Sequence, residues 1–109
     1  MRLEIRGTNF ALTPAIREHA DRKLRAALNR FETRVSLVSV RVGDLNGPRG
    51  GADNICRVSI SCESLSPILI EDVGDDLYAA ISRAADRAGH AISRSFARAQ
   101  SERRAWSLR

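Results

Sequence analysis

The amino-acid sequence predicts an α+β fold: a two-layer sandwich of order β-α-β-β-β-α, with both helices on one face of a four-stranded sheet. Two observations about the strands and helices predict it. Four segments alternate apolar and polar residues, which is typical of strands with one covered and one solvated face. Two longer segments repeat apolar residues at the spacing of a single helix face, so both helices should lie on the covered side of the sheet.

The first strand and the first helix are predicted in the first third of the chain. Apolar and charged side chains alternate over residues 2–6, as in a half-buried strand. Thr13 and Pro14 then begin a helix, because threonine is a good N-cap and proline at the first helical position loses no hydrogen bond. Apolar residues at helical spacing continue it to about residue 32. They are Ile16, Ala20, Leu24, Ala27, Leu28 and Phe31.

Three further strands are predicted over residues 35–44, 54–63 and 68–73. The first two are joined by a turn-rich loop at 46–51, which we interpret as a hairpin connection. Pro67 directly before the last strand indicates a strand start or a sheet edge. The inward-facing residues of the first two of these strands are Val38, Val40, Val42, Cys56, Val58, Ile60 and Cys62.

A long second helix is predicted from Asp75 or Asp76 to about Arg103. Either carboxylate can cap the helix start, where the backbone dipole favours negative charge. Gly89 lies in the helix interior, where glycine costs about 1 kcal/mol relative to alanine. We therefore expect Gly89 to allow close packing against the sheet or the other helix.

The length of 109 residues fits a single domain over residues 1–104, followed by a frayed tail over residues 105–109. Trp106 in this tail is expected to be a loose end, with a base-stacking platform as the alternative. No segment approaches the roughly 20 apolar residues of a membrane span, and the N-terminus lacks the apolar region of a signal peptide. We expect a cytoplasmic protein with no membrane partner. Cys56 and Cys62 cannot bridge each other along one strand and are expected in the core.

The charge balance is basic: 18 Lys and Arg residues face 13 Asp and Glu residues, for a net charge of +5. Lys23 is the only lysine. Arginine binds phosphate through paired hydrogen bonds, whereas lysine acts as a point charge. The codon bias of a GC-rich genome would produce the same excess of arginine, so the placement of the arginines is more informative than their number.

Basic side chains form a row along the second predicted helix. The row consists of Arg83, Arg87, His90, Arg94 and Arg98. They point within about 80° of one another around the helix axis, opposite the apolar face. The first helix also sorts its charges: His19, Arg22, Lys23 and Arg30 lie on one flank and Glu18, Asp21 and Glu32 on the other. Side by side, the two helices would form a cationic surface about 20 to 30 Å across. The alternative is a solvated, arginine-rich helix face.

Such a surface fits the phosphate backbone of structured RNA, recognised by shape and charge. Sequence-specific reading is not expected, because the aromatic residues do not form a base-stacking pattern on a strand. Arg49 in the loop over 46–51 could also touch RNA. We expect no enzyme, no metal, no cofactor and no small-molecule substrate. The two histidines lie on different helices, and Asp72, Asp75 and Asp76 are interpreted as acids at a helix start.

Several segments resemble one protein family. They are Thr13 to Arg17, Lys23 with Leu24, Phe31, Asp76 to Ile81, and Asp44 to Gly51 followed by Asp53 and Cys56. In this order and spacing they are similar to the ribosome hibernation-promoting factors, also called ribosome-associated inhibitors or sigma-54 modulation proteins. The resemblance covers about residues 3–98.

The resemblance implies a β-α-β-β-β-α fold similar to double-stranded-RNA-binding domains. It implies binding to the small ribosomal subunit and its rRNA, in the channel of messenger and transfer RNA, and a block of translation by occlusion during stress. Lys23, Arg87, His90 and Arg94 match positions where family members carry basic residues. The chain is one residue longer than well-known members between Leu24 and Phe31. It also ends after the first domain, so we expect a monomer without the dimerisation domain of long members.

Two other functions stay open at this point. One is a protein-interaction regulator, as the sigma-54 name suggests. The other is a general binder of structured RNA away from the ribosome. Cosedimentation with small subunits that is lost at high salt would favour the ribosome over both.

Overall fold

The computed structural model describes residues 1–8, 12–44 and 53–107. The element order β-α-β-β-β-α is confirmed. The elements are β1 (Arg2–Thr8), α1 (Pro14–Leu28), the 3₁₀ turn η1 (Asn29–Phe31), β2 (Val35–Asp44), β3 (Asn54–Cys62), β4 (Ile68–Gly74) and α2 (Leu77–Ser107). The predicted loop over 46–51, with Arg49, lies outside the described residues.

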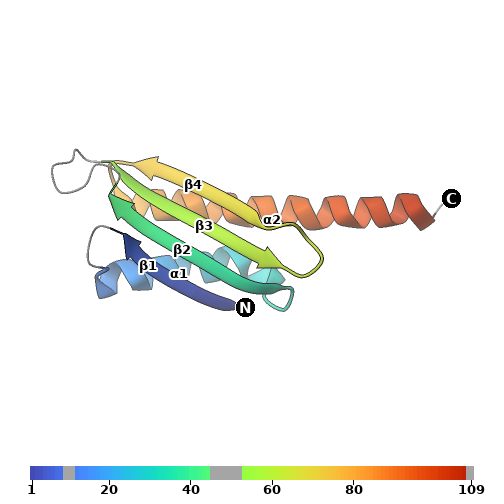
Figure 1. Cartoon of the computed structure of the whole chain (residues 1–109), viewed down its shortest axis with the longest axis horizontal. Coiled ribbons are helices and arrows are strands. Elements are labelled where there is room, and N and C mark those ends of the chain that lie inside the picture. The colour runs from blue at the N-terminus through green and yellow to red at the C-terminus, as the bar shows by residue number, and fades with distance from the viewer. Residues whose placement is uncertain (9–11, 45–52, 108–109) are drawn as a thin grey trace.

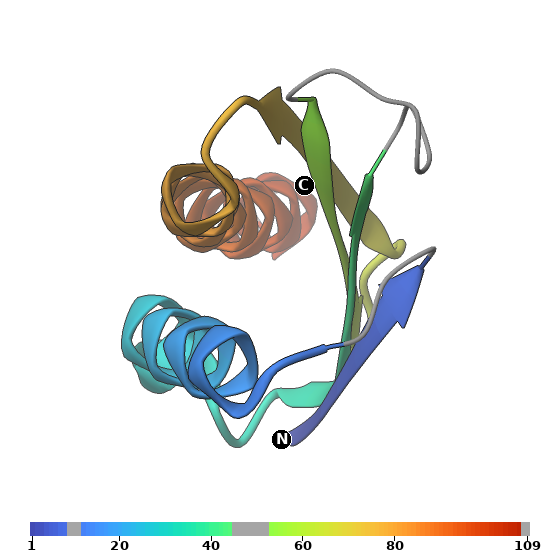
Figure 2. The same ribbon diagram turned by 90° about the vertical axis from the view of Figure 1, so that its left-hand side faces the viewer.

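The four strands form one sheet in the order β1-β2-β3-β4. β1 and β2 are parallel because α1 carries the chain back between them, whereas β2, β3 and β4 are joined as antiparallel neighbours. Both helices cover the same face of the sheet (Figures 1 and 2), which confirms the predicted two-layer α+β sandwich. β4 is an edge strand and begins directly after Pro67, as predicted.

The core lies between the sheet and the helices. In β2 and β3 the predicted inward residues Val38, Val40, Val42, Cys56, Val58 and Ile60 are fully buried. Cys62 at the end of β3 is half-buried, and both cysteines are free thiols. The helices contribute an aliphatic and alanine-rich surface: Ile16, Ala20, Leu24, Leu28, Ala80, Ile81, Ala84, Ala85, Ala88, Ile92 and Phe96.

Both helices begin at the caps that the sequence indicates. The Thr13 Oγ1 accepts a hydrogen bond from the Ile16 N–H at 3.2 Å, and Pro14 is the first residue of α1. At the start of α2 it is Asp76, not Asp75, that caps: its Oδ1 accepts from the Tyr78 N–H at 3.0 Å. A carboxylate at this place also suits the positive end of the helix dipole.

The second helix is longer than predicted. It continues to Ser107 instead of ending near Arg103, so the predicted frayed tail is corrected for residues 105–107. The residues after Gly89 contain neither glycine nor proline, and nothing in the sequence therefore ends the helix. Phe96 is its last buried residue, and the following turns project beyond the sheet (Figure 1). Trp106 lies on this projecting part with 75% of its surface exposed.

The two helices run in the same direction and pack closely. A Cβ atom at Gly89 would lie 3.1 Å from the carbonyl oxygen of Ala27, which confirms the close packing expected at Gly89 and assigns it to the other helix. Further along, the rings of Phe31 and Phe96 stack with their centroids 5.3 Å apart. None of the helices in the described part of the chain is long and apolar enough to cross a membrane.

Candidate nucleic-acid interface

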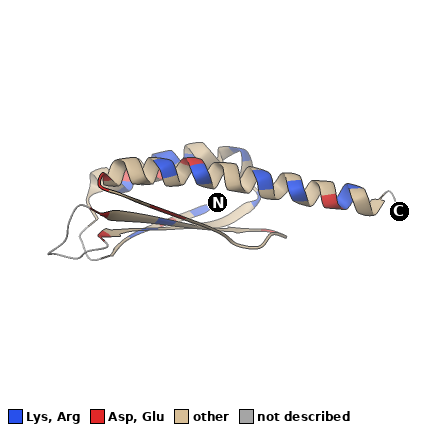
Figure 3. Ribbon diagram, turned by 90° about the horizontal axis from the view of Figure 1, so that it is seen from above, with Lys and Arg blue, Asp and Glu red and all other residues tan. Residues whose placement is uncertain are grey.

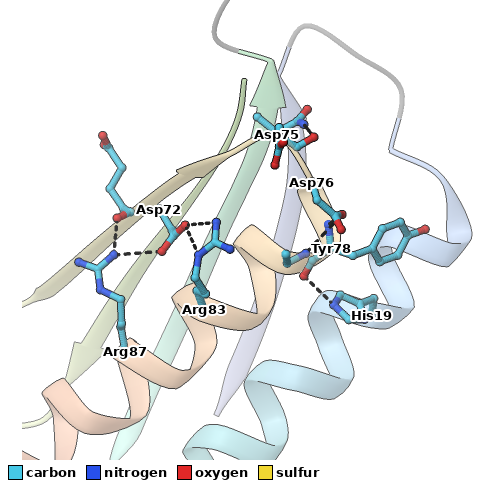
Figure 4. A network of polar contacts seen from close by, with 10 residues as sticks. His19, Asp72, Asp75, Asp76, Tyr78, Arg83 and Arg87 are labelled. Atoms are coloured by element: carbon cyan, nitrogen blue, oxygen red, sulfur yellow. Dashed lines mark hydrogen bonds and ion pairs between the residues drawn. The ribbon is translucent and has the colours of Figure 1, made fainter. Parts of the chain in front are cut away.

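The basic flank of α1 faces α2. His19 lies in the N-terminal half of α1, where its Nε2 is 3.1 Å from the Tyr78 carbonyl oxygen (Figure 4). The same Nε2 is 3.1 Å from the Ser82 Oγ. Its Nδ1 is 3.4 Å from the Arg22 Nη2. Because a guanidinium can only donate, Nδ1 accepts and Nε2 carries the proton that it donates toward α2. His19 therefore joins the two helices and holds Arg22 beside it.

The N-terminal part of the basic row on α2, namely Arg83 and Arg87, is bound to β4 at the edge of the sheet. Arg83 donates from Nε to the Asp72 Oδ1 at 3.0 Å, and its Nη2 lies 2.9 Å from the same oxygen (Figure 4). Arg87 donates from Nη1 to the Glu71 carbonyl oxygen at 2.7 Å and lies 3.4 Å from the Asp72 Oδ2. The hydrogen bond to Asp72 raises the pKa of Arg83. Two of the five residues of the predicted basic row, Arg83 and Arg87, are therefore paired with Asp72 in the free protein.

The sequence pattern did not predict these pairs because they involve a residue of the neighbouring strand. Helical periodicity gives the direction of a side chain around its own axis, but not what the fold places beside that axis. Asp72, interpreted from the sequence as a helix-start acid, lies instead on β4, with only 10% of its side chain exposed. Its carboxylate reaches both arginines, each of which still has about half of its side chain exposed to solvent.

The remaining residues of the predicted basic surface make fewer contacts within the protein. Lys23 and Arg94 are exposed and make no ion pair or hydrogen bond with another residue that the structure describes. Arg30 and His90 line one shallow hollow between the helices, together with Asp86. Arg98 lies against the turn before β4, beside Pro67. Basic residues are thus spread along both helices (Figure 3), and Arg30 and His90 line one hollow between them.

A basic groove lies at the far end of the helix pair, and the sequence reasoning missed most of it. It has a volume of about 490 Å³. Its lining residues are Arg30, Phe31, Arg34, Ser93, Phe96, Ala97, Gln100 and Arg103. The Arg34 guanidinium carbon lies 3.6 Å from the centroid of the Phe96 ring, an arrangement that holds the cation in place by a cation–π contact. Three guanidinium groups around stacked rings are suited to a phosphate group.

Arg34 and Arg103 were missed for different reasons. Arg34 lies in the turn between η1 and β2, where neither helical nor strand periodicity applies. Arg103 was placed at the predicted end of the second helix. The helix in fact continues past it to Ser107, and Arg103 lines the groove together with Arg30. Among the residues that the structure describes, no group of three or more His, Cys, Asp or Glu side chains could hold a metal ion.

The fold and the basic helix layer define a class of protein, namely a small α+β domain that presents arginines from two parallel helices. The chain belongs to the family described as sigma 54 modulation protein / S30EA ribosomal protein, whose sequence profile matches residues 3–100. This is a family of ribosome-associated factors of the hibernation and translation-modulation type. No match to the chain is found among curated protein sequences.

Two solved structures are similar. One is a ribosomal subunit interface protein from Coxiella burnetii, 18% identical, with a TM-score of 0.74 over 89% of this chain and 99% of that one. This likeness supports the fold alone. The other is the N-terminal domain of Thermus thermophilus Protein Y, 27% identical, with a TM-score of 0.71 over 86% of this chain and 98% of that one.

Proposed function

We propose that this protein binds the small ribosomal subunit through rRNA phosphates and blocks translation by occupying the channel of messenger and transfer RNA. The observation that carries the proposal is the set of exposed basic side chains on the helix layer. We call this set the helix surface: Arg22, Lys23, Arg30, Arg34, Arg83, Arg87, His90, Arg94, Arg98 and Arg103. The family supports ribosome association, and the helix surface is the part of the molecule best suited to RNA.

The physical argument rests on displaced counterions. Each phosphate neutralised by a cation releases condensed ions, so affinity falls with salt by about 0.7 to 0.9 logarithmic units per contact. Lys23 and Arg94 are paired with no carboxylate of the described residues, and the Phe96 ring holds the Arg34 guanidinium in place before RNA arrives. Arg83 and Arg87 contribute less, because Asp72 competes with phosphate for them.

Occlusion requires no chemical step. A domain whose longest dimension is 59 Å excludes other ligands from a channel by occupying it. The acids near the start of α2 are used structurally, since Asp72 binds arginines and Asp76 caps the helix. We therefore propose a non-enzymatic, monomeric factor that acts where ribosomes are, in the cytoplasm.

Cosedimentation with purified small subunits tests the proposal. Lys23→Gln with Arg94→Gln should weaken binding at least tenfold and reduce the salt slope by about 1.5. Arg2→Gln with Arg25→Gln is the matched control, because it removes the same charge from residues paired with Glu4 and Asp21 away from the helix surface. Arg87→Glu is avoided, since a new carboxylate beside Asp72 would disturb the fold.

The outcomes separate the alternatives. Salt-sensitive binding to small subunits, with little binding to an unrelated RNA hairpin, supports the proposal. Equal affinity for both would indicate a general structured-RNA binder. Binding that ignores salt, or equal effects of the two double variants, would contradict the role of the helix surface and favour a protein-interaction regulator.

A further inference from the structure

A second row of arginines crosses the opposite face of the molecule. Arg6 on β1 is paired in register with Arg41 on β2, and Arg41 is paired with Arg57 on β3. Their chain neighbours Ile5, Val40 and Val58 are buried under the helices, so the three arginines lie on the face that the helices leave open (Figure 2). We call this row the arginine ladder.

The ladder is poorly compensated within the protein. Glu71 on β4 continues the same row and accepts a hydrogen bond from the Arg57 Nε at 2.9 Å. Glu4, the nearest carboxylate on β1, is paired with Arg2 at 3.1 Å. Arg6 and Arg41 are exposed and make no ion pair or hydrogen bond with any described residue. Like charges directly opposite on neighbouring strands oppose folding, so this arrangement needs an external anion to be favourable.

We propose that the arginine ladder is a binding site for the phosphates of an RNA strand, separate from the helix surface. Neighbouring strands lie about 4.8 Å apart, so the three guanidinium groups span about 10 Å, a length that covers about two or three phosphates of one strand. Two open hollows flank the Arg41–Arg57 pair, and Asp44 also lines one of them. One, of about 300 Å³, is also lined by the hydroxyls of Ser39 and Ser59, which can donate to phosphate or ribose oxygens.

The surroundings favour RNA over an acidic protein partner. Protein interfaces depend on a buried apolar or aromatic centre. Beside the ladder, Leu69 is 71% exposed and Val73 is 44% exposed on the same face of β4. Glu71, which is paired with Arg57, lies between them, so the two side chains do not form one apolar centre. Guanidinium groups flanked by small hydroxyls are instead typical of backbone contacts to nucleic acid. With the helix surface on one face and the ladder on the other, the domain can contact two RNA segments at once.

The test uses Arg6→Thr with Arg41→Thr, because threonine favours strands and carries no charge. Binding to purified small subunits should weaken about tenfold, with the salt slope reduced by about 1.5. The thermal midpoint of the free protein should not fall, because the substitution removes repulsion. The matched control here is Arg25→Gln with Arg104→Gln, because both residues lie on helices and neither is on the open face of the sheet. Affinity and slope equal to those of this control would overturn the proposal.

A photoreactive phenylalanine at Ser39 identifies the partner. Cross-links to rRNA support the ladder as an RNA site, and cross-links to ribosomal protein alone overturn it. The two variants test the helix surface and the arginine ladder independently. If Lys23→Gln with Arg94→Gln abolishes binding while the ladder variant binds like wild type, the proposed function stands and the ladder does not. If only the ladder variant loses binding, the ladder stands and the helix surface does not.

Discussion

Asp72→Asn should lower the stability of the protein and raise its affinity for RNA. The Asp72 carboxylate holds Arg83 and Arg87 against the edge of β4, at 2.9 and 3.4 Å. Asparagine keeps an acceptor oxygen for one of these guanidinium groups but removes the charge. Both arginines then lose their internal competitor for phosphate and remain at the helix surface.

The size of each effect follows from exposure. The carboxylate is mostly buried, but both arginines are half exposed, so solvent screens the pairs. We expect the free energy of unfolding to fall by about 1 to 2 kcal/mol, between the values for exposed pairs and for charged hydrogen bonds. About 1 kcal/mol of lost competition corresponds to a roughly fivefold gain in affinity, and one added phosphate contact steepens the salt slope by about 0.8.

Urea denaturation and binding to small subunits as a function of salt measure the two effects. Asp21→Asn is the control, because it removes the same charge and breaks the 3.0 Å ion pair with Arg25 on the other flank of α1. This control should change affinity by about twofold or less, because Asp21 is paired with Arg25 and not with a residue of the helix surface. An Asp72→Asn affinity that is unchanged, or that falls together with stability, would refute the reasoning.

Three further predictions concern the fold. Burial raises the pKa of Cys56 to about 12, so above pH 9 the unfolded chain loses a proton that the folded chain keeps. The free energy of unfolding should therefore fall by about 1 kcal/mol per pH unit, and Cys56→Ala should flatten this slope in urea titrations at high pH. Gly89→Val should destabilise by about 2 kcal/mol, because its side chain would press on the Ala27 carbonyl; a neutral result would contradict the close helix contact. Asp76→Ala should cost about 1 kcal/mol in thermal unfolding by removing the cap of α2, whereas Asp75→Ala, which removes no cap, should cost less.

The strands and their faces could be predicted from sequence because side-chain alternation is a local property. Val38, Val40 and Val42 share a face in any sheet, and covering one face with helices decides which face is buried. The helix caps at Thr13 and Asp76 follow in the same way from residues next to the helix start. Gly89 was informative because an interior glycine carries a cost that only close packing explains.

The features that escaped prediction depend on neighbours distant in the chain. Asp72 reaches Arg83 and Arg87 only because β4 lies beside α2, and no local pattern contains that information. The arginine ladder depends on strand register: alternation predicts that Arg6 and Arg41 face outward, but not that they stand opposite each other. Arg34 joined the basic groove through its contact with Phe96, across the fold.

A structure of the protein bound to the small ribosomal subunit, determined by electron cryo-microscopy, tests the central claim most directly. Our account predicts density for α1 and α2 against rRNA, with phosphates beside Lys23, Arg30 and Arg94, inside the channel of messenger and transfer RNA. A complex in which the helix layer faces solvent or ribosomal protein, or in which the domain lies outside that channel, would contradict it.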